Sequence, residues 1–329
     1  MSKLIVVLGG TGNQGGSVIK AFLNDSSFRV RAVARNPSSA AAQALKAKGV
    51  DVVQGEFTDI SSLTQAFKGA NYIYAMTPDI GVNGAAIMAE GKVASVVEEA
   101  YRLELQAGKN IVAAADTATD TLEVFILSSL SAAKHHSDHA YQLIYHFDAK
   151  ADVVKFLEST YPTLARKTAA LLLGMFATNW QMSSPLRPTK QVDGRYRILM
   201  PCSPETPIPF IDPNNDPAIF VKALASQDLP LPLGVSMVRK FAGYAKMTTF
   251  AEWTTLINNQ LPVEVYFEQT TMEEWAAMVD FIPGLGMELA QMWSYCEKVG
   301  YFGGQNGGTR IITDVSIQSS PGLRTRESD

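Results

Sequence analysis

The sequence predicts an α/β fold in which helices cover both faces of a doubly wound parallel β-sheet. Three observations support this prediction. Short β-branched runs alternate with helix-length segments through the first half of the chain, a glycine-rich turn joins the first run to the first helix, and 47% of the 329 residues are apolar. The alternation is typical of strands joined by right-handed crossovers, and the apolar share is enough to bury a large core.

Five runs in the first half are predicted as strands because they are short, apolar and rich in β-branched or aromatic residues. The segments between them carry apolar residues at spacings of three and four, which is the pattern of amphipathic helices. Thr58 or Asp59 can cap the helix expected over residues 61–68, and Gly69 can end it. The predicted strands cover residues 4–8, 29–34, 50–55, 70–76 and 122–127.

The chain changes character in two places. Residues 77–107 make the fourth crossover longer than a single helix requires, so we expect an extra helix or a lid-like insertion there. After Asn179 prolines become frequent and the strand-like pieces are short. We therefore predict a first domain over residues 1–180 and a smaller mixed α/β substrate region over residues 181–329, some strands of which can return to the main sheet.

The stretch GGTGNQGG, residues 9–16, lies between a predicted strand and a predicted helix, as a dinucleotide-binding loop does. Gly9 and Gly10 suit a tight turn, and Gly12 allows the backbone to approach a diphosphate. Gly15 allows the helix to pack on the strand. Amide groups at the helix N-terminus then bind the diphosphate. The alternative is a glycine-rich turn without a ligand.

Arg35, at the end of the second predicted strand, indicates which dinucleotide is bound. A site that prefers NAD places an acidic residue about 20 residues after the loop, where it binds the ribose hydroxyl. A guanidinium instead suits a 2′-phosphate, to which it donates charge-assisted hydrogen bonds. We therefore expect NADP(H) as the cofactor, and the alternative is a solvated surface arginine.

The charge pattern indicates a small-molecule partner. The net charge of -4 comes without a stripe of lysine and arginine, so nothing predicts contact with nucleic acid or a membrane surface. Met1 is followed at once by a strand pattern, and no apolar stretch reaches membrane-spanning length. Cys202 and Cys296 lie far apart, which fits buried thiols in a reducing compartment. We expect a cytoplasmic protein.

Five motifs in order resemble the NmrA-like family, an atypical branch of the short-chain dehydrogenase/reductases with relatives among the isoflavone-reductase-like enzymes. The motifs are GGTGNQGGSV, ARNP after the second strand, VVQGEFTD after the third, QAGKNIVAAAD, and YHFDAKADVVKFLE. The resemblance covers residues 3–180 well and the rest loosely. It implies a Rossmann domain over the first 180 residues that binds NADP(H).

The resemblance also implies cofactor contacts at positions along the whole first domain. The glycine loop would wrap the diphosphate, Arg35 and its neighbours would meet the adenosine phosphate, and later residues would lie by the adenine, the ribose and the nicotinamide. Lys109 would reach toward the nicotinamide end. The implied cofactor-binding residues are Gly9, Gly10, Thr11, Gly12, Asn13, Gln14, Arg35, Asn36, Ser38, Glu56, Phe57, Thr77, Pro78, Lys109, Lys150, Met175, Phe176 and Asn179.

Three residues are candidates for catalysis: Lys150, His146 and Ser128. In ordinary short-chain dehydrogenases a Tyr-x-x-x-Lys pair on one helix face does the proton chemistry, and here His146 stands where the tyrosine would be. Lys150 can bind the ribose or act directly as an acid or base, and His146 titrates in a useful range. Ser128 or Ser129 matches the superfamily's substrate-polarising serine, although strand-end serines also cap helices.

Two functions follow from different classes. The first is an NADP(H)-dependent oxidoreductase that transfers hydride to or from a small organic metabolite. The second is a non-catalytic NADP(H)-sensing regulator that acts through protein partners and for which a nuclear location is also expected; the replacement of tyrosine by His146 favours it. A redox-inactive lyase, isomerase or cyclase on the same scaffold is a third, weaker alternative.

The stretch KHHSDHA brings His135, His136, Asp138 and His139 together. Their helical spacings suit zinc, but zinc sites usually draw on more than one segment and need an ordered second layer of hydrogen bonds. We therefore predict no metal site. The alternatives are a polar loop beside the mouth of the active site and a solvated loop.

Overall fold

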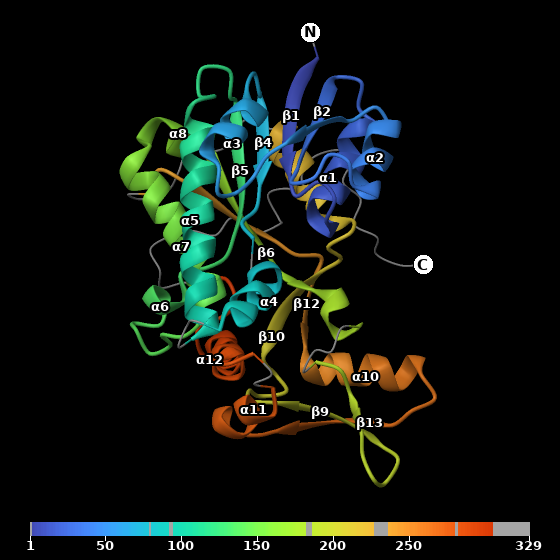
Figure 1. Cartoon of the computed structure of the whole chain (residues 1–329). Helices are drawn as coiled ribbons and strands as arrows, with labels where there is room; N and C mark the ends of the chain where they lie inside the picture. Colours follow the sequence, from blue (N-terminus) through green and yellow to red (C-terminus); the bar gives the residue numbers. More distant parts are fainter. Residues whose placement is uncertain are drawn as a thin grey trace.

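A seven-stranded parallel sheet forms the centre of the protein (Figure 1), as the sequence predicts. The computed structural model describes residues 2–78, 80–91, 95–181, 186–226, 236–279 and 282–304. The strand order is β11-β6-β5-β4-β1-β2-β3, the doubly wound arrangement with its switch point between β1 and β4. The strands are β1 (Lys3–Leu8), β2 (Phe28–Ala34), β3 (Asp51–Gln54), β4 (Tyr72–Ala75), β5 (Val124–Ser129), β6 (Thr168–Leu173) and β11 (Arg239–Gly243).

The five predicted strands are confirmed, and two further strands extend the sheet. The β6 strand, TAALLL, is buried along its whole length, so it shows no alternation of polar and apolar residues. The β11 strand comes from the second half of the chain and pairs in parallel with β6. The chain after residue 180 therefore contributes directly to the main sheet.

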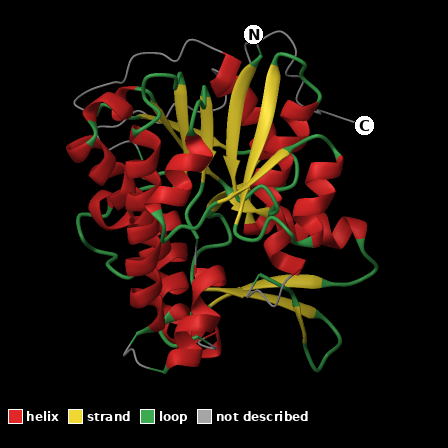
Figure 2. Ribbon diagram, turned by 45° about the horizontal axis from the view of Figure 1, so that its top comes forward, coloured by secondary structure: helices red, strands yellow, loops and turns green. Residues whose placement is uncertain are grey.

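Helices cover both faces of this sheet (Figure 2). One face packs against α3, α5, α7 and α8, and the other packs against α1 and α9. The long crossover is explained by α4, which precedes α5 and packs on it through Ile87, Val96 and Ala100. The helices of this layer are α1 (Asn13–Leu23), α2 (Ala40–Ala47), α3 (Ile60–Phe67), α4 (Ile80–Glu90), α5 (Val96–Asp116), α6 (Ala133–His136), α7 (Tyr145–Thr160), α8 (Pro162–Arg166) and α9 (Asp216–Ser226).

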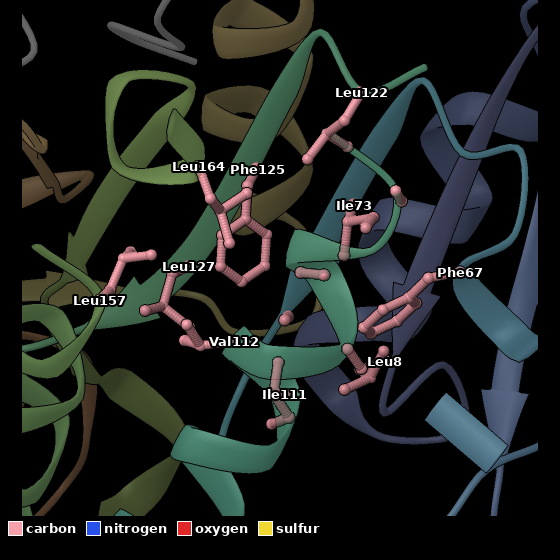
Figure 3. Packing of buried hydrophobic residues seen from close by; sticks show 14 of the residues in the cluster. Leu8, Phe67, Ile73, Ile111, Val112, Leu122, Phe125, Leu127, Leu157 and Leu164 are labelled. Carbon is pink, nitrogen blue, oxygen red and sulfur yellow. The ribbon is translucent and has the colours of Figure 1, made fainter. Parts of the chain in front are cut away.

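The core on the α5 side joins residues from strands and helices that lie far apart in the sequence (Figure 3). Phe125 and Leu127 of β5 meet Val112 of α5 and Leu157 of α7, and all four are buried. Burying one side chain of this size contributes about 1.5–3 kcal/mol. This shared core fixes α5 and α7 on the sheet and therefore fixes the polar residues that they carry.

Helix α3 confirms the predicted start and end of the helix expected over residues 61–68. Asp59 caps it by accepting a hydrogen bond from the amide of Ser61 at 2.9 Å. Gly69 follows its end with a φ of 73°, in the left-handed region that favours glycine.

Two small three-stranded sheets and three helices form the lower part of the molecule in Figure 1. Their shared core includes Phe250, Trp275 and Trp293. Cys202 and Cys296 are both buried and free, as expected. None of the helices in the described parts of the chain has the length and apolar content needed to cross a membrane. The remaining elements are β7 (Met175–Phe176), β8 (Thr189–Lys190), β9 (Tyr196–Met200), β10 (Pro207–Ile211), β12 (Lys246–Thr249), β13 (Val265–Gln269), α10 (Phe250–Gln260), α11 (Met272–Val279), α12 (Leu285–Lys298) and a 3₁₀ turn (Ala177–Gln181).

The close approach of α5 to α7 depends on Gly108. A Cβ atom on this residue would lie 2.1 Å from Cγ2 of Val153 on α7. Gly108→Ala is therefore expected to lower the free energy of unfolding by about 1–3 kcal/mol through overpacking, measured by denaturant unfolding. Adding Val153→Ala should recover part of the loss. Gly16→Ala is the control, since its nearest neighbour would lie at 3.7 Å; an equal loss there would contradict this explanation.

Candidate functional site

The glycine-rich loop turns sharply between β1 and α1. Gly9 has a φ of 64°, and its carbonyl accepts a hydrogen bond from the amide of Gly12 at 2.9 Å. A Cβ atom on Gly15 would lie 2.4 Å from the Gly9 carbonyl oxygen, so only glycine lets α1 pack this closely. Gly10 is also crowded, because a Cβ there would lie 2.5 Å from Cδ1 of Ile19 and 3.0 Å from Cβ of Ala32.

The N-terminus of α1 is open to a ligand. Gly12 is the N-cap and supplies no side-chain hydrogen bond, and Thr11, Gly12 and Asn13 are exposed. The helix has no acidic residue in its first turn. Free amide groups at the positive end of an 11-residue helix therefore face solvent, which is the arrangement that binds a diphosphate.

The residues expected to bind the adenosine end of the cofactor follow β2 and β3, the two strands on one side of β1 in the sheet. Arg35, Asn36 and Ser38 are exposed, and the amide of Ser38 donates to the Asn36 side chain at 2.9 Å. The Arg35 guanidinium makes no hydrogen bond or ion pair with another described residue. Glu56 and Phe57 are half-buried on the neighbouring strand end, and the Phe57 carbonyl accepts from the Asn110 side chain.

Gln14 ties the loop to the end of β5. Its Oε1 accepts hydrogen bonds from the hydroxyl of Tyr74 at 2.8 Å and from that of Ser128 at 3.1 Å. Burial raises the pKa of Tyr74 well above its usual range, so this hydroxyl stays protonated. Ser128 lies two residues after Ile126 and therefore points to the same face of the sheet, the one that α1 covers. Helix α7 covers the opposite face. The structure thus bonds Ser128 to the glycine loop and does not bring it to Lys150.

Lys150 lies in a buried polar cluster between α5 and α7. Its Nζ contacts Oε1 of Glu104 at 2.5 Å, and the two side chains are 14% and 2% exposed. The hydroxyl of Thr77 donates to the same Glu104 oxygen. Thr77 follows β4, and a Cβ atom on Gly9 of the loop would lie 3.0 Å from Sδ of the neighbouring Met76. The cluster therefore lies next to the glycine-rich loop, at the carboxyl edge of the sheet.

His146 is held by a second buried carboxylate. Oε1 of Glu288, on α12, contacts Nδ1 of His146 at 2.8 Å and accepts from the His146 amide at 2.9 Å. Glu288 is 1% exposed. The carbonyl of His146 accepts from Nζ of Lys150 at 3.3 Å. The imidazole therefore connects α7 to α12, and it is the backbone of His146, rather than its ring, that contacts Lys150.

The structure does not bring Lys109 into this cluster. Its Nζ lies 5.4 Å from the ring centroid of Phe156, further along α5, and Glu104 occupies the position beside Lys150 instead. Met175 is buried in the core of the lower part, and Phe176 packs against the α1-side core. Asn179 is half-buried in the 3₁₀ turn, and the Pro78 carbonyl accepts from the Asn83 side chain.

Glu104 and Glu288 are missing from the residues expected at the site. A signal for Glu104 exists, because it shares the buried stripe of α5 with Ala100, Ala107 and Ile111. A carboxylate on an apolar stripe at helical spacing indicates a buried charge that needs a partner. Glu288 gives the same kind of signal, because it shares the buried face of α12 with Leu285, Met292 and Tyr295; its partner His146 lies 142 residues away in the sequence.

The histidine stretch 135–139 does not form a cluster with metal-ligand geometry among the residues that the structure describes. No group of three or more His, Cys, Asp or Glu residues in the described ranges could hold a metal ion. His135 and His139 are exposed, while His136 is half-buried with its ring 5.6 Å from that of His135.

Comparisons with solved structures show where this fold recurs. NmrA, a negative transcriptional regulator solved with NADP, superposes with a TM-score of 0.68 at 18% identity, covering 96% of this chain and 90% of that one. An NADPH-dependent quinone oxidoreductase from Escherichia coli, solved with NADPH, gives 0.66 at 19% identity, covering 95% and 94%. At these identities the likeness shows the shared fold.

Sequence comparisons point to the same family. An NmrA-like family domain-containing oxidoreductase of Aspergillus campestris is 48% identical over 67 residues, which is 20% of each chain. An NmrA-like family domain-containing protein of Dictyostelium discoideum is 39% identical over 97 residues, covering 29% of this chain and 32% of the relative. Each alignment thus spans a third or less of the relative. The NmrA-like family itself matches residues 1–327, nearly the whole chain, so the protein belongs to the NmrA-like family.

Proposed function

We propose that this protein is an NADP(H)-dependent oxidoreductase that acts on a small organic substrate by hydride transfer. The observation that carries the proposal is the buried cluster of Lys150, Glu104 and Thr77 beside the glycine-rich loop. The Lys150 side chain is 14% exposed and the Glu104 carboxylate that holds it is 2% exposed. Burying two charges in this way carries a large desolvation penalty. Such arrangements concentrate at functional sites.

The residues present fit NADP(H). Gly15 permits the close helix packing that a diphosphate loop needs, the α1 amides are free, and Arg35 has no partner among the described residues. Gly9 to Gln14 would hold the diphosphate, Arg35 with Asn36 and Ser38 the 2′-phosphate, and Thr77 and Lys150 the nicotinamide ribose. When bound, the cofactor supplies the hydride chemistry.

Lys150 is proposed to supply the proton or to orient the reacting oxygen. Glu104 holds the lysine Nζ at the carboxyl edge and Thr77 holds Glu104, so the position of the ammonium group is fixed by two elements. Ser128 donates its hydroxyl proton to Gln14 and would have to release Gln14 first. Glu288 takes up Nδ1 of His146 and leaves Nε2 free of partners among the described residues, but the ring is held toward α12 and only the backbone of His146 contacts Lys150. Lys150 is therefore the group that we propose for the proton step.

The named relatives support the proposal without identifying the substrate. Several are called NmrA-like family domain-containing oxidoreductases, and one structural neighbour is an NADPH-dependent quinone oxidoreductase. We extend the proposed substrate class to small carbonyl compounds, enones, imines and quinones.

A cofactor-sensing regulator is the second candidate. The contact between His146 and Glu288 favours this candidate. His146 takes the helix position at which short-chain dehydrogenases present their tyrosine, and here that side chain is bonded to a carboxylate of α12. In that case the bond would couple the cofactor side of α7 to α12 and hence to the lower part of the molecule.

The ion pair itself is tested by stability. Lys150→Met leaves the buried Glu104 carboxylate without a counter-ion, and Glu104→Gln leaves the Lys150 ammonium group without one. Each change is expected to lower the free energy of unfolding by about 3–5 kcal/mol. The double variant should recover most of this loss, measured by denaturant unfolding at pH 7. Purely additive losses would show that the two side chains do not depend on each other.

Catalysis is tested by NADPH oxidation with a panel of aromatic ketones, enones, imines and quinones. We expect turnover of at least one class, lowered at least about 100-fold in the double variant Lys150→Met/Glu104→Gln because the proton group is absent. NADPH affinity should change far less. Lys155→Met, an exposed lysine on the same helix, is the control. Tight NADPH binding without substrate-dependent oxidation across the panel would refute the oxidoreductase and favour the regulator.

The choice of cofactor is tested at Arg35. Arg35→Asp should weaken NADPH binding at least about tenfold, because it replaces a phosphate-binding cation with a repelling anion, and should leave NADH binding within about threefold. Arg29→Asp, exposed at the start of the same strand, is the matched control. Titration calorimetry with both cofactors gives the comparison, and equal losses would contradict the role of Arg35.

A further inference from the structure

A cavity of about 830 Å³, large enough for a small organic molecule, lies on the side of α7 that faces away from the Lys150 cluster. Asp148, Ala151 and Lys155 of α7 line it at helical spacings, whereas Lys150 and His146 lie on the opposite face of the helix. None of the residues expected to bind cofactor lines this cavity. It is therefore separate from the glycine-rich loop.

Strand β11 forms one wall of the cavity and places the ammonium group of Lys240 there without a bonded counter-ion among the described residues. Lys240 pairs in register with Ala170 of β6, is half-buried and lines the cavity. Its amine makes no hydrogen bond or ion pair with another described residue. Burial lowers the pKa of Lys240 from its usual value, and the nearby charge of Glu158 opposes this.

Glu158 does not serve as a direct counter-ion. Its Oε1 accepts hydrogen bonds from the Ser236 hydroxyl at 2.5 Å and from the amides of Met237 and Val238, each at 3.0 Å. These bonds commit that oxygen to the segment leading into β11. A half-buried ammonium that faces a cavity without a bonded anion is stabilised by an anionic ligand.

His136 also lines the cavity, close enough to Lys240 to feel its charge. Its Nδ1 is buried without a hydrogen-bond partner, and it lies so close to Gly303 that a Cβ there would approach within 2.2 Å. Burial, followed by the charges of Lys240 and His135, lowers the pKa of His136 to about 4, so the ring is neutral at pH 7. Asp138 and His139 next to it have φ angles of 49° and 64°, a strained conformation for residues other than glycine.

The remaining lining restricts the ligand. Ala170, Leu172 and Phe302 offer apolar contact, while Asp148, Asp152 and Glu98 place carboxylates elsewhere in the cavity. Burial, above all, raises the pKa of Asp148 to about 6, so this carboxylate is ionised at pH 7. Lys134 and Lys155 also line the cavity and partly offset these carboxylates. A ligand with a single carboxylate can meet Lys240 without bringing the second charge of a dianion such as phosphate close to them.

We propose that this cavity is a second binding site, for a small monocarboxylate with an apolar body, in which Lys240 binds the carboxylate and His136 lies beside it. The apolar residues contact the rest of the ligand. The site does not depend on the proposed oxidoreductase activity, because it shares no residue with the cofactor loop or the Lys150 cluster; of the candidate catalytic residues only Ser129, the alternative to Ser128, lines it.

The probe is benzoate, titrated by calorimetry into the full chain with NADPH present. A compound of this size is expected to bind once per chain with a Kd of about 1 mM. Lys240→Met should weaken binding at least tenfold and leave NADPH affinity unchanged, which separates this site from the proposed cofactor site. Lys46→Met, an exposed lysine on α2, should change neither affinity.

Benzamide and inorganic phosphate complete the test. Both should bind at least tenfold more weakly than benzoate, because benzamide lacks the charge and phosphate lacks the apolar body. The proposal fails if benzoate shows no binding at 10 mM, about ten times the expected Kd, if benzamide binds as well as benzoate, or if Lys240→Met leaves the benzoate affinity unchanged. An unchanged unfolding temperature of Lys240→Met shows that a lost affinity does not come from unfolding.

Discussion

The ion pair between Lys150 and Glu104 is the interaction around which the candidate active site is arranged. It joins α7 to α5 in the interior, and Thr77 binds the same carboxylate from the end of β4. Removing either partner leaves an uncompensated charge in a place that water barely reaches. The pair therefore constrains the two helices and the strand end together, and it places an ammonium group beside the glycine-rich loop.

Two other features make this pair possible. Gly108 lets α5 approach α7 closely, because any larger residue would meet Val153. The shared core of Phe125, Leu127 and Leu157 holds both helices on the sheet (Figure 3). Packing thus positions the helices, and the charges take the positions that packing allows. The same helix α7 faces the cavity with Asp148 and Lys155, so one element separates two chemically different environments.

The bond between His146 and Glu288 shows how the second half of the chain takes part in the site. Glu288 lies on α12, in the lower part of the molecule, and it binds both the ring and the amide of His146 at the start of α7. In the same way β11 completes the sheet and supplies Lys240. The two halves of the sequence therefore share one sheet and one set of polar contacts.

The sequence by itself determined the layered fold, since strand and helix periodicities are local and each was visible in its own segment. It also determined the glycine-rich loop, because Gly9 takes a φ that favours glycine and Gly15 has no room for a Cβ atom. Only the tertiary structure decided that Glu104, and not Lys109, stands beside Lys150, and that Ser128 binds Gln14. A buried charge is defined by partners from other elements, and in a long chain the pairing of those elements is not encoded in any local pattern.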